Sequence, residues 1–214
     1  MVCSRKITNF TITLSRFSMN ADPTKDKIIK VASTIFGKYG FQKTTMDEIA
    51  RTARKAKGSL YYYFNSKEDL FLAVVSREMD TLRDALLKVV EKQNEPSAMI
   101  RDYMLTRMHV LKDAVNYHET LKADFLGTFE FLDELRSRFD TFEVDLLSGI
   151  LQKGVDAKSI EVEDVNKTAQ VIILAMKAIE IPFYLQNKIT EYEHTIVELL
   201  DILIRGLERG AQPA

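Results

Sequence analysis

The sequence predicts an all-α protein with a small N-terminal three-helix unit and a larger C-terminal helical unit. Its 214 residues include only 8 Gly and 4 Pro, so few positions interrupt a helix. In the N-terminal part, apolar residues recur at three- and four-residue intervals, the period of amphipathic helices. With 46% hydrophobic residues, the chain has enough apolar side chains for an ordinary globular core.

The first three helices are delimited by their capping signals. Asp22-Pro23 is typical of a helix start, and Gly40 of a left-handed helix end. Thr45 with Glu48 fits a capping box and opens a second short helix. A third short helix is expected over residues 56–64, with Leu60, Tyr63 and Phe64 facing inward.

The remaining helices are longer. A capping signal at Ser66 opens a helix that we expect to run to about Lys92, and Asn94-Glu95-Pro96 interrupts the chain. Further helices are expected over 97–115, 118–127, 129–153, 162–186 and 190–209, with Gly127 and Gly154 between them. The domains are then 22–66 and 67–214, preceded by an arm of residues 1–21.

The arm has no helical period, contains three basic residues and no acidic one, and is expected to be disordered. Two interpretations stay open: a basic arm that reaches DNA, or a start of the native chain at Met19.

Charge is distributed unevenly along the chain. Residues 1–67 contain 13 Lys and Arg against 4 Asp and Glu, a formal +9, whereas the rest contains 17 against 27, a formal −10. This asymmetry indicates a polyanionic partner at the N-terminal end; uneven surface statistics are the alternative.

The second and third helices, joined by a tight turn, form a helix-turn-helix, whose last helix enters the DNA major groove. Its outward positions carry amines, hydroxyls, aromatic rings and a glycine that permits close approach. A second set of hydroxyls and amines lies at the starts of the neighbouring helices. The predicted contacts to double-stranded DNA are Thr44, Thr45, Lys55, Lys57, Gly58, Ser59, Tyr61, Tyr62 and Lys67. Two of these residues have a structural alternative. Tyr61 could pack at the edge of the core, and Lys67 could be a solvated lysine at a helix start.

Residues 36–71 read FGKYGFQKTTMDEIARTARKAKGSLYYYFNSKEDLF, which resembles the DNA-binding signature of the TetR (tetracycline-repressor) family. The matching patterns are F-x-x-x-G-[YF], T-T-x-x-x-I-A and K-G-x-L-Y-x-x-F-x-[ST]-K-E-x-L. The resemblance implies a dimeric repressor that leaves a pseudo-palindromic operator when a small apolar or amphipathic effector binds. The turn departs from the pattern, because Arg54 and Lys55 replace the usual glycine and apolar residue. A left-handed Arg54 would carry about 1 kcal/mol of strain.

The C-terminal unit is expected to form a homodimer. The segment 171–185 is apolar nearly all round, and the last helix has a widened apolar stripe, so both helices need a second surface to pack on. The predicted interface residues are Ile173, Lys177, Tyr184, Ile196, Leu199, Leu200 and Leu203.

Aromatic and Met side chains with a few polar residues predict an adaptable ligand pocket in the middle helices, although plain core packing accounts for them equally well. The candidates are Tyr103, Arg107, Met108, Leu111, Phe125, Phe129, Phe142, Met176, Glu180 and Phe183. Arg107 suits an anionic head group and Glu180 a cationic one, and the sequence leaves both open.

Other classes of protein find little support. The sequence lacks the H-E-x-x-H, phosphate-loop and nucleophile-elbow motifs, so we expect no enzyme, catalytic residue, metal site or cofactor. The single Cys3 and the absence of an uninterrupted apolar span predict a cytoplasmic protein without a membrane contact. A helix-turn-helix architectural protein without a small ligand is the alternative function.

Overall fold

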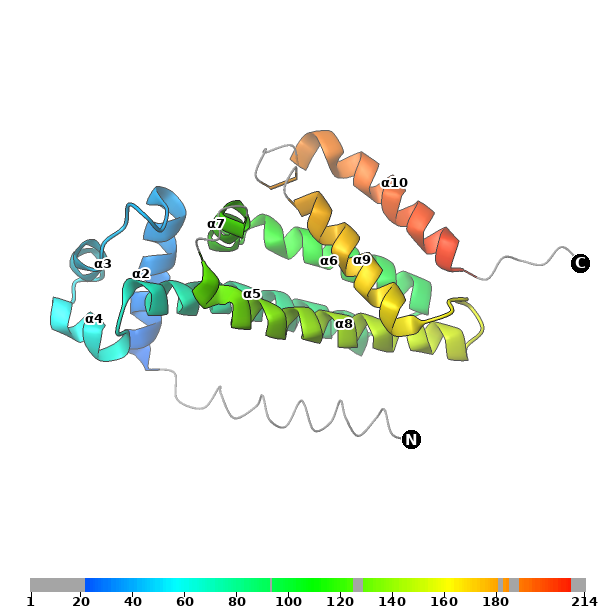
Figure 1. Ribbon diagram of the computed structural model, residues 1–214, viewed down its shortest axis with the longest axis horizontal. Helices are drawn as coiled ribbons and strands as arrows, with labels where there is room; N and C mark the ends of the chain where they lie inside the picture. The colour runs from blue at the N-terminus through cyan, green and yellow to red at the C-terminus, as the bar shows by residue number, and fades with distance from the viewer. Residues whose placement is uncertain (1–21, 93, 125–128, 181–182, 185–188, 209–214) are drawn as a thin grey trace, which may run out of the picture. The chain divides into compact units, whose positions relative to one another are not determined.

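The computed structural model describes residues 22–92, 94–124, 129–180, 183–184 and 189–208 (Figure 1). The expected arm, residues 1–21, and Phe125 therefore lie outside the described residues. Within the described part of the chain the regular structure is helical, as predicted, and the chain divides into two compact units, 1–74 and 75–214.

The N-terminal unit contains α2 (Pro23–Tyr39), α3 (Met46–Ala53), α4 (Lys57–Tyr63) and the start of α5 (Lys67–Glu91). Their ends follow the predicted caps. Asp22 Oδ1 accepts from the Thr24 N–H at 2.8 Å, and Thr45 Oγ1 accepts from the Glu48 N–H at 3.3 Å. Gly40 ends α2 as expected and its N–H donates to the Phe36 carbonyl at 2.7 Å, but with φ 81° and ψ 159° its backbone differs from the expected left-handed cap. Arg54 has the predicted left-handed backbone, with φ 54° and ψ 48°.

An aromatic cluster forms the centre of this unit. The ring centroids of Phe36 and Phe71 are 5.1 Å apart, and those of Phe41 and Phe71 are 4.9 Å apart. Phe71 and its neighbours Leu70 and Val74 are buried, so the first turns of α5 belong to the N-terminal unit. For that reason the division falls at Val74 rather than at the expected Ser66.

The C-terminal unit contains the rest of α5, α6 (Pro96–Lys112), α7 (Val115–Asp124), η1 (Glu130–Leu132), α8 (Asp133–Asp156), α9 (Val165–Glu180) and α10 (Ile189–Leu207). Helix α8 packs against both α6 and α9, and α10 packs against α6 (Figure 1). An ion pair between Arg101 and Asp201 also joins α6 to α10.

Several helix ends differ from expectation: α6 ends at Lys112 rather than at 115, α7 begins at Val115 rather than at 118, and α8 begins at Asp133 rather than at 129. Two further differences have a visible cause. Gly154 lies inside α8 rather than at its end, because the buried Ile160 packs against it so closely that a Cβ on Gly154 would lie 2.4 Å from Ile160 Cδ1. Helix α9 begins at Val165 rather than at 162, because Asp164 Oδ1 accepts from the Lys167 N–H at 3.0 Å and caps the helix start.

Candidate nucleic-acid interface and ligand cavity

Helix α4 displays polar and aromatic side chains around one buried anchor. Leu60 is fully buried, whereas Tyr61 and Tyr62 are 42% and 82% exposed. A Cβ on Gly58 would meet no atom within 4 Å, so the helix backbone is open to close approach at its first turn. Exposed tyrosine rings and an accessible backbone are suited to contacts with a DNA backbone and with base edges.

Lys57 adds a positive charge to this surface. Its Nζ lies 2.8 Å from Asp47 Oδ1 on α3 and 6.0 Å from the centroid of the Tyr61 ring. The hydrogen bond and the charge of Asp47 raise the pKa of Lys57, so the amine stays protonated at neutral pH. Both side chains of the pair are exposed, which makes the amine available to a phosphate.

The other end of α4 is attached to the start of α2. Tyr63, expected to face the core, is half-buried, and its hydroxyl donates to Asp22 Oδ2 at 2.6 Å. Lys55 Nζ lies 3.5 Å from Thr24 Oγ1 in the same region. The start of α2 therefore holds both the turn before α4 and the last turn of α4.

Four other predicted DNA contacts differ in how far they are exposed. Thr44 is buried, and its hydroxyl donates to the Gly40 carbonyl at 2.8 Å. Contrary to expectation, its side chain is therefore not available to DNA. Thr45 is exposed at the start of α3. Lys67 Nζ donates to the Phe41 carbonyl at 2.9 Å and lies 4.3 Å from the centroid of the Phe41 ring, so it holds the loop before α3. Ser59 is half-buried.

A cavity of about 300 Å³ lies in the C-terminal unit between α5, α6, α7, α8 and α9. Part of the lining is apolar and includes Met79, Leu82 and Phe139. Another part, the charged wall, includes Arg107 and Glu180. A cavity with an apolar wall and a few convergent polar groups has the character of a small-molecule site.

A buried hydrogen-bond network forms the charged wall. Arg107 Nε donates to Glu143 Oε1 at 2.7 Å, and its Nη1 donates to Glu180 Oε1. Tyr103 Oη donates to Glu143 at 2.7 Å, and Tyr117 Oη donates to Glu180 at 2.8 Å. Burial lowers the pKa of Arg107, but the two carboxylates outweigh it and raise the pKa overall, so the guanidinium stays charged. Burial raises the pKa of both tyrosines, which keeps their hydroxyls protonated as donors.

The cavity brings together two of the predicted ligand residues, Arg107 and Glu180, and Tyr103 joins them through the network. Met108 is half-buried, and the other described candidates are buried but do not line the cavity: Leu111, Phe129, Phe142, Met176 and Phe183. Sequence reasoning missed Glu143 and Tyr117. Their signal was weak, because each is a single polar residue in a segment of mixed polarity.

The predicted dimer residues divide into inward and outward groups. Ile173 and Leu200 are buried inside the chain, and Tyr184 Oη donates to the Met108 carbonyl at 2.8 Å, so these side chains face inward, contrary to expectation. Lys177 is half-buried and forms an ion pair with Asp140. Leu199 is partly exposed, Leu203 is half-buried, and the side chain of Ile196 lies outside the described residues.

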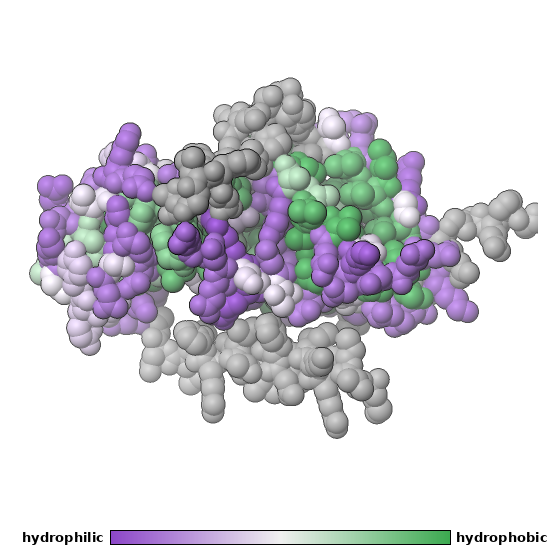
Figure 2. All heavy atoms as spheres, viewed as in Figure 1, coloured by the Kyte–Doolittle hydropathy of each residue, from purple (hydrophilic) through white to green (hydrophobic). Residues whose placement is uncertain are grey.

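The exposed apolar side chains of α9 and α10 are instead Val171, Leu174, Val197 and Ile202, together with Leu199. Figure 2 shows hydrophobic side chains gathered over this part of the C-terminal unit. Leu174 and Ile202 are 69% and 67% exposed, a degree of exposure that large apolar side chains adopt mainly where another surface covers them.

Two other kinds of site find no support in the described ranges. No helix there is long and apolar enough to cross a membrane. No group of three or more His, Cys, Asp or Glu side chains in the same ranges is arranged to hold a metal ion.

Comparison with known proteins agrees with the helix-turn-helix geometry. Residues 28–74 match the family model described as bacterial regulatory proteins, tetR family. An uncharacterised HTH-type transcriptional regulator, YfiR of Bacillus subtilis, is 30% identical over 139 residues, which cover 63% of this chain and 67% of that protein. The HTH-type transcriptional regulator QacR of Staphylococcus aureus is 25% identical over 195 residues, 86% of this chain and 98% of QacR.

Solved structures share the fold over most of the chain. A transcriptional regulator from Cytophaga hutchinsonii superposes with a TM-score of 0.71 at 23% identity, covering 85% of this chain and 97% of that one. The fatty acid degradation regulator FadR from Bacillus halodurans gives 0.71 at 20% identity, covering 89% and 100%. The DNA-binding signature, the helical fold and these relatives together show that the chain belongs to the TetR family of transcriptional regulators.

Proposed function

We propose that this regulator is a dimeric, sequence-specific repressor that releases its operator when a small apolar or amphipathic ligand enters the cavity of the C-terminal unit. The observation that carries the proposal is α4, whose exposed tyrosines and protonated Lys57 surround an open glycine backbone. A protein of this kind acts in the compartment that holds the DNA, which is the cytoplasm of a bacterium.

The geometry supports a smaller DNA-contact set than the sequence predicted. Lys57, Gly58, Tyr61 and Tyr62 lie on the exposed surface of α4, and Thr45 is exposed at the start of α3. Lys55 and Ser59 are half-buried and remain secondary contacts. Thr44 and Lys67 contribute by holding the loop between α2 and α3.

A second copy of the chain is the proposed partner of the exposed apolar surface on α9 and α10. Val171, Leu174 and Ile202 would be covered in a two-fold dimer, in which the same surface of each chain meets its copy. Two symmetrically placed α4 helices then fit the two half-sites of a pseudo-palindrome.

The buried network narrows the ligand class. Arg107 is 2% exposed and already donates to two carboxylates, so it offers no free charge to an anionic head group. Across the whole lining, the cations of Arg107, Arg136 and Lys177 balance the carboxylates of Asp140, Glu143 and Glu180, so the cavity offers no net charge to a ligand. A solved structure of FadR from Bacillus subtilis, similar in fold, is a complex with stearoyl-CoA; because two carboxylates already hold the guanidinium of Arg107, we do not propose that it binds so anionic a ligand here. The cavity itself supports a sensor rather than an architectural protein.

Tyr117 is the proposed link between the cavity and the DNA-binding unit. Its hydroxyl donates to Glu180 at the cavity wall, and its backbone N–H donates to Glu78 Oε2 on α5 at 2.8 Å. Glu78 also accepts from the Asn116 side chain at 2.7 Å, so it holds the start of α7. Helix α5 is continuous, and its first turns form part of the N-terminal unit. A ligand that breaks the Tyr117–Glu180 bond can therefore bias the position of α5.

The test uses fluorescence anisotropy of an operator duplex, identified by tiling the DNA beside the gene, with apolar compounds that thermal shift finds to bind the protein. We expect such a ligand to release the wild-type protein from the duplex. In Tyr117→Phe, DNA affinity without ligand should be retained while the ligand's effect falls several-fold. Tyr103→Phe is the matched control, since it removes a hydroxyl from the same network but lies on α6. Ligand binding without any release of DNA would contradict the proposal.

A further inference from the structure

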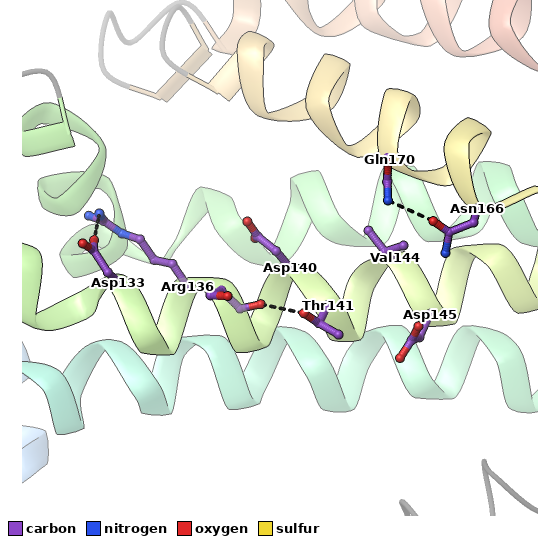
Figure 3. A pocket seen from close by; sticks show the side chains of 9 residues that line it. Asp133, Arg136, Asp140, Thr141, Val144, Asp145, Asn166 and Gln170 are labelled. Carbon is purple, nitrogen blue, oxygen red and sulfur yellow. Dashed lines mark hydrogen bonds and ion pairs between the residues drawn. The ribbon is translucent and has the colours of Figure 1, made fainter.

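The C-terminal unit has a second hollow, an open groove of about 590 Å³ between α8 and α9 (Figure 3). Figure 3 shows Asp140 and Val144 of α8 on one side and Gln170 and Asn166 of α9 on the other. In contrast to the cavity, the groove is lined almost entirely by polar side chains.

The groove and the cavity meet at two residues of α8. Arg136 and Asp140, one helical turn apart, line both hollows. Asp140 forms an ion pair with Lys177, which lines the cavity. Arg136 is held by the Thr120 carbonyl at 3.2 Å and by Asp133 at 3.5 Å. The two residues that both linings share are therefore held in ion pairs.

This boundary is easily opened. The side chains of Lys177 and Asp140 are 32% and 45% exposed, and partly exposed ion pairs contribute little free energy because water screens them. Both are long or flexible enough to turn outward and keep their charge in solvent. Separating Lys177 from Asp140 should therefore cost little free energy.

The two hollows differ in how much of their lining is apolar. The cavity has an apolar wall, to which Met79, Leu82 and Phe139 contribute. The groove carries the carboxylates of Asp133, Asp140 and Asp145, with hydroxyl and amide groups between them. Arg136 pairs with Asp133 and Lys177 with Asp140, so one negative charge is in excess. An apolar chain suits the first hollow, and a cation that donates hydrogen bonds suits the second.

We infer that cavity and groove form one extended binding site for an elongated amphipathic amine, with its alkyl end in the cavity and its protonated amine in the groove. The inference rests on the proposed effector site and specifies its ligand. It makes Asp140 and Asp145 specificity-determining residues, and it makes the Lys177–Asp140 pair the gate through which the alkyl chain passes.

The test compares three ten-carbon probes that differ only in the head group: decylamine, 1-decanol and decanoate. Each is titrated into the full-length protein by isothermal calorimetry at pH 7, below its micelle concentration. We expect decylamine to bind tightest, on the order of tenfold better than decanoate, because two partly exposed carboxylates each contribute a few-fold. Phe139→Trp, which reduces the cavity, should weaken all three probes.

Groove variants locate the head group. Asp145→Asn and Asp140→Asn should each weaken decylamine by about two- to fivefold and leave 1-decanol unchanged. Glu134→Gln is the control, because it removes one negative charge from an exposed position of α8 outside the lining of the groove. Asp140→Asn should also speed association of all three probes by releasing Lys177.

Three outcomes overturn the inference: no binding of any probe, equal affinity for the three head groups, or groove variants that behave like Glu134→Gln. Equal affinities that Phe139→Trp still weakens would leave the effector cavity standing without its extension into the groove. Conversely, groove-dependent binding of decylamine that never displaces operator DNA would retain the extended site and contradict only the proposed release mechanism.

Discussion

The guanidinium of Arg107 and the carboxylate of Glu143 meet inside the C-terminal unit, with Nε 2.7 Å from Oε1 and exposed fractions of 2% and 0%. The two residues are 36 positions apart in the sequence, on α6 and α8. Removing either charge from water is costly, and the pair is tolerable because Tyr103, Tyr117 and Glu180 complete its hydrogen bonds.

Replacing Arg107 should therefore be much more damaging than its lost packing alone. Arg107→Met leaves Glu143 and Glu180 buried without their cation and should lower the free energy of unfolding by about 3–5 kcal/mol. Urea denaturation followed by circular dichroism measures this. The triple variant Arg107→Met, Glu143→Gln, Glu180→Gln should recover part of the loss, and a single-variant loss below about 1 kcal/mol would disprove the role of the network.

Glu78 predicts a pH-dependent stability. Burial raises the pKa of its carboxyl above the usual 4.5, despite the hydrogen bonds from Asn116 and Tyr117 that lower it. The folded protein thus holds this proton more firmly than the unfolded chain does. The protonated carboxyl of Glu78 contributes to the free energy of unfolding in full below pH 4.5, and this contribution is lost as the pH rises through the raised pKa.

The free energy of unfolding of Glu78→Gln, relative to that of the wild type, should therefore rise from pH 4.5 to pH 7. Urea denaturation at the two pH values measures this change. The exposed Glu134→Gln should show no such trend. If the free energy of unfolding of Glu78→Gln instead fell relative to that of the wild type as the pH rises, the folded protein would favour the carboxylate form of Glu78.

Lys57 should account for about one phosphate contact in each chain. Lys57→Ala is expected to weaken operator binding and to reduce the slope of log affinity against log salt by about 1 per subunit, without loss of stability, since the side chain is exposed. Anisotropy titrations at several salt concentrations give the slope. An unchanged slope would mean that Asp47 keeps the amine even in the presence of DNA.

Leu174 and Ile202 should determine the oligomeric state. Leu174→Glu places a charge on the exposed apolar surface and should shift the protein from two chains toward one in sedimentation equilibrium, with a parallel loss of operator affinity. Thr81→Glu, at an exposed position of α5, is the matched control. A variant that remains dimeric would place the interface elsewhere.

Gly154 should tolerate no side chain. A Cβ there would lie 2.4 Å from Ile160 Cδ1, so Gly154→Ala should cost about 1–3 kcal/mol in thermal or urea unfolding. Gly149→Ala, on the same helix with no atom within 4 Å of the added Cβ, should be neutral or slightly stabilising. Equal effects of the two variants would show that Ile160 moves aside freely.

Local signals predicted most of the fold. Asp22, Gly40 and Thr45 end or begin helices because their own backbone and side-chain preferences act within a few residues. Arg54 has the left-handed conformation that the turn between α3 and α4 was expected to need, although an arginine stands there. The same locality limited the prediction at Gly154, whose distant neighbour Ile160 decides its role.

The candidate sites were less predictable because direction and partnership depend on tertiary structure. A helix that is apolar nearly all round does not reveal that Ile173 faces inward and Leu174 outward. The hydroxyl of Thr44 looked available until the Gly40 carbonyl was placed beside it. The partners of Arg107, Glu143 and Glu180, lie far along the chain, so the sequence did not reveal that they engage its guanidinium.

The most direct test of the regulator is binding to short duplexes tiled across the DNA beside its own gene, by fluorescence anisotropy at two salt concentrations. We predict tight binding to one pseudo-palindromic duplex, in steps of two chains and weakened by salt, with little affinity for its neighbours. Weak and uniform binding to every duplex, at one chain per site, would contradict the account of α4 as the helix that reads an operator.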